Sequence, residues 1–372
     1  MSSTLAETPL HAWHAAHHAR LVDFAGWSMP VQYTSIVAEH NATRSSAGLF
    51  DISHMGRLRF DGPGSAAFLD RLLTRRVADQ TAGHIRYSLV TNDDGGILDD
   101  VLLYRLLDAA GRDYFVLVVN ASNREKIVGW IQPRLTAEHD DVEMTDLTHE
   151  LAMIAVQGPR AIEWLQPLVQ MPLASMKYYT GAETQIAGRR GIVSRTGYTG
   201  EDGCELIVPA GAVEDVWQLL ANAGATPAGL GCRDTLRLEA AMPLYGHELS
   251  EHINPYAAGL AFAVHLEGRE FPGRDVLARL KDDPAQPVRI GLELPGKRVP
   301  REGFHILQQG QGAGWQTVGE TTSGTFSPTL NRPIAMGYVA SHASQPGTEL
   351  AIDIRGRPEP ARVVKLPFYR RK

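Results

Sequence analysis

Two adjacent carboxylates, Asp99 and Asp100, interrupt an otherwise apolar run between residues 97 and 107. Because side chains alternate along a strand, Asp99 is expected to share a face with Val101, and Asp100 to point the other way with Leu102. A buried carboxylate without a partner is costly, so at least one of the pair is expected to have a polar partner, to lie beside a cleft or to titrate abnormally. The alternative is an exposed edge strand on which both acids are solvated.

Two further stretches combine polar groups with glycines. Residues 197–203 read Gly-Tyr-Thr-Gly-Glu-Asp-Gly, and the three glycines beside Glu201 allow a flat ligand to approach the backbone closely. The same pattern also fits an ordinary hairpin tip, and it lacks the Lys-Ser/Thr ending of a phosphate-binding loop. Arg233 lies at an expected helix start, where a cation is unusual because of the helix dipole, so a ligand or an ion-pair role is indicated. The Gly-x-Gly at residues 229–231 is too weak to predict a dinucleotide site.

Metal binding is not predicted. Four histidines lie close together near the start of the chain, and His11, His14 and His18 could share one helix face. No nearby acid or cysteine completes a ligand set. Cys204 and Cys232 are too far apart for a Cys-x-x-Cys pair. Two reduced thiols in a cytoplasm are therefore the default interpretation, and a disulfide is the alternative.

Length and composition are typical of a globular chain with more than one domain. The 372 residues exceed one ordinary core, and 44% of them are hydrophobic against 21% that are charged. A formal net charge of −6 and the lack of a long Lys/Arg run argue against nucleic acid as the main partner, although a few local arginines could still hold a small anion. No apolar run approaches a membrane span, and nothing basic precedes Arg20, so neither a secretory nor a transit signal is predicted. We therefore expect a cytoplasmic protein that does not bind membranes.

A hairpin is expected to position the acid pair. Residues 85–91 alternate like a strand, and Asn-Asp-Asp-Gly-Gly at 92–96 is a turn signal, because Gly and Asn tolerate the positive φ that tight turns need. Further strands and helices complete a split βαβ-like plan over about residues 52–150. The acid pair is thus expected on a sheet that two helices cover.

The C-terminal part of the chain differs in composition. The best boundary is the polar, Pro-interrupted segment at residues 281–287. Beyond it the chain is almost entirely short strands and turns, which predicts a small antiparallel β-barrel over residues 288–372. Residues 1–280 are expected to hold the site, with residues 26–30 as a turn and a helix over 35–47 that Gly48 ends.

Six ordered motifs resemble one known family, the aminomethyltransferases, or T-proteins, of the glycine cleavage system. Each motif alone is weak, but six of them in this order, over nearly the whole chain, are a strong signal. The matching segments are residues Val22–Trp27, Leu49–Met55, Gly95–Asp100, Tyr198–Gly203, Arg233–Glu239 and Thr322–Pro328.

The resemblance implies a fold and a reaction. The fold is an α+β folate-binding fold of three parts arranged like a cloverleaf, of which the last is the C-terminal antiparallel β-barrel. In the reaction, the methylene carbon of an aminomethyl group on the lipoyl arm of a carrier, the H-protein, passes to the co-substrate tetrahydrofolate. Ammonia, methylene-tetrahydrofolate and dihydrolipoyl H-protein are the products, and neither a metal nor a flavin is expected.

The resemblance also implies roles for individual residues. By position in the motifs, Asp99 corresponds to the family's essential acid, Glu201 to the acid that holds the pterin, and Arg233 to a folate-contacting arginine. Asp99 is then expected to orient the folate nucleophile and to stabilise the positive charge that develops as ammonia leaves, with Asp100 as a structural acid on the opposite face. Further residues match segments expected to contact folate, namely Met55, Tyr87, Asn120, Tyr198 and Tyr369.

Two other functions use the same fold. A stand-alone tetrahydrofolate-dependent demethylase would act on a small, free methylated compound, whereas flavin-linked demethylases are fused to a dehydrogenase for which this chain has no room. A folate-binding iron–sulfur assembly factor is disfavoured, because its Lys-Gly-Cys-Tyr motif has no counterpart around Cys204 or Cys232. The aminomethyltransferase is the leading hypothesis.

Overall fold

The computed structural model describes residues 4–135, 141–310 and 314–371. The hairpin predicted around the acid pair is present, and it joins β6 (Ile85–Thr91) to β7 (Ile97–Leu107) in antiparallel pairing. The turn closes because the side chain of Asn92 accepts a hydrogen bond from the backbone N–H of Gly96, while Gly95 takes a positive φ of 78°.

A five-stranded sheet in the order β6-β7-β8-β5-β9 contains this hairpin. Helices α3 and α4 cover one face of the sheet and form a core with its apolar side chains, as expected. The opposite face packs against a second sheet. The remaining elements of this part are β5 (Gly56–Asp61), α3 (Ser65–Leu72), β8 (Asp113–Val119), α4 (Arg124–Ile131) and β9 (Glu143–Asp146).

The second sheet has six strands in the order β11-β12-β13-β10-β4-β14. Alternate side chains of β10 divide between two cores: Ile154 faces helices α1, α5 and α6, whereas Met153 faces the first sheet. The elements are α1 (His11–Ala16), β4 (Gly48–Asp51), β10 (Leu151–Gln157), α5 (Ala161–Leu165), β11 (Gly181–Ile186), β12 (Arg189–Ser194), β13 (Gly203–Pro209), α6 (Val213–Ala223) and β14 (Thr226–Pro227).

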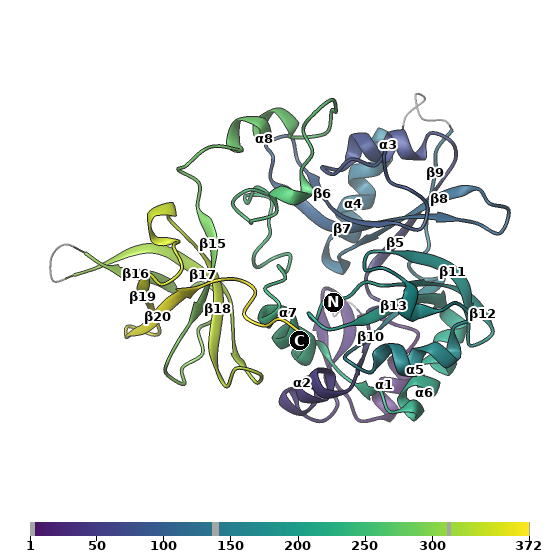
Figure 1. Ribbon diagram of the computed structural model, residues 1–372, viewed down its shortest axis with the longest axis horizontal. Coiled ribbons are helices and arrows are strands. Elements are labelled where there is room, and N and C mark those ends of the chain that lie inside the picture. Colours follow the sequence, from purple (N-terminus) through teal and green to yellow (C-terminus); the bar gives the residue numbers. More distant parts are fainter. Residues whose placement is uncertain (1–3, 136–140, 311–313, 372) are drawn as a thin grey trace.

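Smaller elements connect the second sheet to the rest of the chain. A three-stranded sheet has the order β1-β3-β2, and the side chain of Ser35 caps the following helix α2 by accepting a hydrogen bond from the backbone of Ala38. Helix α7 packs against α2 and lies between the sheets and the barrel (Figure 1). These elements are β1 (Ala6–Glu7), β2 (Arg20–Phe24), β3 (Trp27–Gln32), α2 (Ile36–Ser45), α7 (Leu230–Glu239) and α8 (Arg274–Leu280).

The C-terminal strands close into an antiparallel barrel in the order β15-β18-β17-β16-β19-β20. The barrel has its own apolar core and stands to one side of the two sheets in Figure 1. This confirms the predicted α+β fold with a C-terminal β-barrel, whereas the division into residues 1–280 and 288–372 stays a prediction. The strands are β15 (Val288–Glu293), β16 (His305–Gln309), β17 (Trp315–Ser327), β18 (Arg332–Val339), β19 (Glu349–Asp353) and β20 (Pro358–Val364).

Two local predictions are wrong. The segment at residues 26–30 is mostly strand β3 rather than a turn, because the reversal is confined to Ala25 and Gly26, which both have positive φ. Gly48 does not end a helix but opens β4, and α2 ends at Ser45. Close packing explains the glycine, because an added Cβ at this position would lie 2.2 Å from Oγ1 of Thr43.

The N-terminal histidines have separate partners. His11 contacts the hydroxyl of Ser28 at 3.1 Å, and the buried ring of His14 bridges Asp51 at 2.9 Å and Tyr33 at 2.8 Å. Within residues 4–135, 141–310 and 314–371, no group of three or more His, Cys, Asp or Glu side chains is arranged to hold a metal ion. Over the same residues, no helix has both the length and the apolar character that a membrane span needs.

Candidate active site

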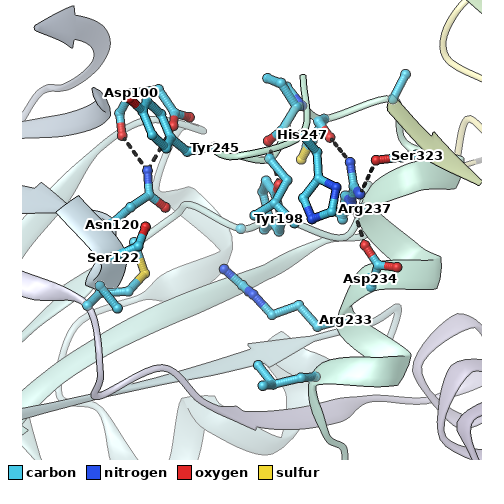
Figure 2. A pocket seen from close by; sticks show the side chains of 18 of the residues that line it. Asp100, Asn120, Ser122, Tyr198, Arg233, Asp234, Arg237, Tyr245, His247 and Ser323 are labelled. Carbon is cyan, nitrogen blue, oxygen red and sulfur yellow. Dashed lines mark hydrogen bonds and ion pairs between the residues drawn. The ribbon is translucent and has the colours of Figure 1, made fainter. Parts of the chain in front are cut away.

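A cavity of about 740 Å³ lies where the sheets, α7 and the barrel meet. Figure 2 shows Asp100 and Asn120 on one side of it and Arg237 and Ser323 on the other. These side chains come from β7, from the loop after β8, from α7 and from the barrel strand β17, so several distant segments build one site. A cavity of this size with mixed apolar and polar walls fits a small organic ligand.

The acid pair divides between the two faces of β7, as alternation predicts, but the expected faces are reversed with respect to the cavity. Asp99 has no exposed surface and lies with Val101 and Leu103 on the face that α3 and α4 cover. Asp100 lines the cavity together with Leu102. The carboxylate presented to a ligand is therefore that of Asp100, and Asp99 lies behind it. Both faces of β7 are rich in apolar residues, so alternation alone could not tell which face the helices would cover.

Amide groups hold both carboxylates in place. Asp99 accepts hydrogen bonds from the backbone N–H of Asn120 at 3.0 Å and from the side-chain amides of Asn120 at 2.8 Å and Asn123 at 2.6 Å. Asp100 accepts from the same Asn120 amide at 2.8 Å and from the hydroxyl of Tyr87 at 3.1 Å. Burial raises the pKa of both carboxyl groups, and the charge of Asp100 raises the pKa of Asp99 further, whereas the donors act in the opposite direction. Raised carboxyl pKa values in a cavity are typical of groups that exchange protons with a substrate.

Glu201, the acid predicted to hold a pterin, is not among the described residues that line the cavity. Its buried carboxylate pairs with Arg44 at 2.9 Å and accepts a hydrogen bond from the hydroxyl of Tyr369 at 2.7 Å. Tyr369 lies in the same polar cluster, outside the cavity wall, with its ring centroid 3.9 Å from the guanidinium of Arg44. Both residues thus join the C-terminal tail to α2 in this structure.

The acid that the β13 strand does present to the cavity is Glu205. Glu205 is 5% exposed, and its carboxylate accepts a hydrogen bond from the hydroxyl of Thr196 at 2.6 Å. Burial raises the pKa of Glu205, while that hydrogen bond and the positive charge of Arg233 lower it by less. Glu205 therefore has free acceptor capacity at the surface of the cavity.

Arg233 extends from the first turn of α7 into the cavity (Figure 2). Its guanidinium lies 4.6 Å from the ring centroid of Tyr198, whose hydroxyl donates to the backbone carbonyl of Pro243. The buried Nη1 atom of Arg233 has no hydrogen-bond partner among the described residues. Burial lowers the pKa of Arg233, and the nearby charge of Glu205 acts against that shift. Because an unpaired buried donor is costly, this guanidinium is suited to bind an acceptor on a ligand.

The cavity brings together most of the residues that sequence analysis selected. In its wall lie Met55, Tyr87, Asn120, Tyr198 and Arg233, whereas Asp99, Glu201 and Tyr369 are outside it. Sequence analysis overlooked Glu205, although the signal was the same as for the acid pair, an acid inside an apolar strand. It also overlooked His54, which burial keeps neutral by lowering its pKa to about 4. His54 lies inside the Leu49–Met55 motif, but no spacing to another polar residue gives it a role.

The fold and the site together define a small-molecule enzyme of the α+β type, with buried acids and a buried arginine around one cavity. Residues 10–268 match the family described as "GCVT N-terminal domain", and residues 288–370 match the "Glycine cleavage T-protein C-terminal barrel domain". These matches cover most of the chain.

Whole-length relatives agree with the domain matches. The aminomethyltransferase of Saccharopolyspora erythraea is 44% identical over 98% of both chains, and that of Rubrobacter xylanophilus is 48% identical over 99% of this chain and 95% of its own. The crystal structure of the glycine cleavage system aminomethyltransferase T from Bartonella henselae superposes with a TM-score of 0.89 at 33% identity, over 98% of both chains. The chain therefore belongs to the glycine cleavage T-protein family of aminomethyltransferases, and it is an enzyme of that class.

Proposed function

We propose that the enzyme transfers the methylene carbon of aminomethyl-lipoyl H-protein to tetrahydrofolate, with release of ammonia. The observation that carries this proposal is that Asp100, Glu205 and Arg233 line one cavity. They supply a carboxyl group of raised pKa, a second acid with free acceptor capacity and a guanidinium whose Nη1 atom has no partner in the described part of the chain. A folate offers complementary groups, because its pterin edge carries adjacent N–H donors and its tail carries carboxylates.

In the proposed folate site, Glu205 takes the place that the sequence motif suggested for Glu201. A carboxylate can accept two adjacent N–H groups side by side, as the pterin edge requires. Arg233 supplies a donor whose own partner is missing within the described residues. The rings of Tyr87 and Phe262, stacked with centroids 5.9 Å apart, and the ring of Tyr198 provide flat apolar surface for an aromatic ligand.

Proton balance explains why the reaction needs an acid such as Asp100. When the carbon becomes bonded to both folate nitrogens, those nitrogens lose two protons. One proton is delivered to the nitrogen that leaves as ammonia, and the other to the sulfur that leaves as a thiol. In its ionised form, Asp100 can accept a proton from a folate nitrogen, and its negative charge stabilises the positive charge that develops as ammonia departs. Contributions from such fixed groups are of the order of a few kcal/mol.

The decisive experiment mixes the enzyme with tetrahydrofolate and aminomethylated H-protein and measures ammonia. We expect ammonia and methylene-tetrahydrofolate in equal amounts, and none when either substrate is left out. The matched reaction replaces the carrier with free methylated amines. Activity with a free amine and none with the carrier would support the stand-alone demethylase instead.

We infer that the enzyme works in the cytoplasm with its carrier. The supporting observation is that both cysteines, Cys204 and Cys232, are free and buried, as is usual for a reducing compartment. Cell fractionation followed by immunodetection tests the location. Recovery of the protein in an extracellular or membrane fraction would contradict it.

A further inference from the structure

The hydrogen bonds to the buried acid Asp99 favour its ionised form, against the effect of burial and of the charge of Asp100 on its pKa. Its three hydrogen-bond partners among the described residues are N–H groups, two from Asn120 and one from Asn123. An N–H group cannot accept a hydrogen bond, so a proton on Asp99 would have no acceptor among these three. A buried acid held in this way, without access to the cavity, has no direct task in binding a ligand.

Asn120 connects Asp99 to the cavity. Its Nδ2 atom lies 2.8 Å from Oδ1 of Asp99, 2.8 Å from Oδ1 of Asp100 and 3.1 Å from the carbonyl oxygen of Asp100. Turning the amide over would place its oxygen against three other oxygens, so the orientation is fixed with the nitrogen toward the acids. Figure 2 shows the nitrogen of Asn120 directed to Asp100, which leaves the amide oxygen as the free acceptor of this cavity residue.

We propose that Asp99 is a positioning residue that acts through Asn120. By fixing the Asn120 amide it holds the Asp100 carboxylate in place and leaves the amide oxygen of Asn120 free for an N–H group of the substrate. This inference rests on the proposed function, in which Asp100 accepts the proton. Two further residues, Asp99 and Asn120, then take part in that reaction. Asn120 contacts substrate, whereas Asp99 does not.

The two neighbouring carboxyl groups also affect each other's ionisation. Two neighbouring carboxylates repel each other, so each raises the proton affinity of the other. Other groups facing the pair are mostly neutral hydroxyls. Among the cations that act on those hydroxyls, Lys126 pairs with Glu251, Arg237 pairs with Glu248 and Arg289 donates to a backbone carbonyl, whereas Arg233 lies over the ring of Tyr198. The facing hydroxyls belong to Tyr87, Tyr198 and Tyr245. Within the pair, the charge of Asp100 raises the pKa of Asp99.

Asp99→Asn tests the inference, because it removes the charge and keeps the size. At saturating substrates we expect kcat to fall at least tenfold, with the KM for tetrahydrofolate within about twofold of the wild type. The acid limb of the pH profile of kcat should move to lower pH, because the second ionisation of the pair, which repulsion between the carboxylates raises, is replaced by the single ionisation of Asp100. A residue that serves only stability would lower the melting temperature and leave this limb in place.

Asp146→Asn is the matched control, because Asp146 is a partly buried acid on the same sheet that pairs with Arg124, away from the cavity. The acid limb of the pH profile of kcat should be the same in this variant as in the wild type. A double variant tests the connection through Asn120: Asp99→Asn should cost little further kcat once Asn120→Ala is present. Additive losses, or an unmoved limb in Asp99→Asn, would overturn the inference. If wild-type enzyme releases no ammonia at all, the proposed function fails instead, so the two failures are distinguishable.

Discussion

The guanidinium of Arg233 lies 4.6 Å from the ring centroid of Tyr198, and its Nη1 atom is buried without a hydrogen-bond partner among the described residues. The aromatic ring supports the cation, but it cannot satisfy the N–H groups of the guanidinium. A ligand that supplies an acceptor offsets the cost of this donor. The contact therefore holds Arg233 in place while its N–H groups stay available to a ligand.

Arg233→Gln should weaken tetrahydrofolate binding by roughly 10- to 100-fold, since a hydrogen bond to a charged group contributes about 1.5–3 kcal/mol. Titration calorimetry measures the dissociation constant. The control is Arg332→Gln, which removes an exposed arginine paired with Glu293 on the barrel and should leave the affinity unchanged. Equal affinities for wild type and Arg233→Gln would exclude this residue from the site.

Glu205 and Glu201 are expected to respond differently to the same substitution. Glu205→Gln should raise the KM for tetrahydrofolate at least tenfold, because Glu205 lines the cavity and the amide cannot accept two N–H groups side by side. Glu201→Gln should instead lower the free energy of unfolding by about 1–2 kcal/mol, because it weakens the buried pair with Arg44, which keeps Glu239 as a second partner. Steady-state kinetics and urea unfolding on both variants give the comparison. The opposite pattern would return the pterin role to Glu201.

Much of the fold could be predicted because its signals are local. The hairpin before β7 follows from turn chemistry at Asn92 and Gly95, and the barrel follows from the density of short strands after residue 287. The strand at Trp27 was missed because the reversal before it needs positive φ at Ala25, a residue that carries no turn signal.

The site could be predicted only in part, because its geometry depends on contacts between distant segments. Alternation separates Asp99 from Asp100, but only the packing of α3 and α4 decides which face is covered. The three glycines of its motif predicted a ligand-binding role for Glu201, but the loop turns its carboxylate toward Arg44. Glu205, in the strand that follows, reaches the cavity.

Asp100→Asn should stabilise the apo-protein at neutral pH while it abolishes most of the activity. Burial raises the pKa of Asp100, so the folded protein binds more protons than the unfolded chain above pH 4, and ionised Asp100 lowers stability as the pH rises. The gain should be on the order of 1–2 kcal/mol at pH 8 and close to zero at pH 4. Urea unfolding at both pH values measures it. A stability loss at pH 8 would show that the ionised carboxylate is well solvated by its partners.

Glu239→Gln should destabilise the protein at neutral pH and have little effect in acid. Glu239 joins α7 to α2 through Arg44 at 2.8 Å and to the barrel through the hydroxyls of Ser327 and Thr329. Burial raises the pKa of Glu239, but hydrogen bonds from His40 and Ser327 and the charges of His40 and Arg44 outweigh it, so that the pKa falls to about 2.

A carboxyl group whose pKa is lowered on folding stabilises the protein. This contribution is fully present above the pKa of the unfolded chain, near 4.3, and is lost as the pH falls toward about 2. The wild type should therefore exceed Glu239→Gln by about 2–3 kcal/mol at pH 7, and the difference should shrink steadily from pH 5 to pH 3. Urea unfolding across this range measures it. Glu293→Gln is the control, because its exposed pair with Arg332 should contribute less than about 1 kcal/mol at any pH. A difference for Glu239→Gln that does not depend on pH would mean that lost packing between α7 and the barrel, rather than lost charge, accounts for the effect.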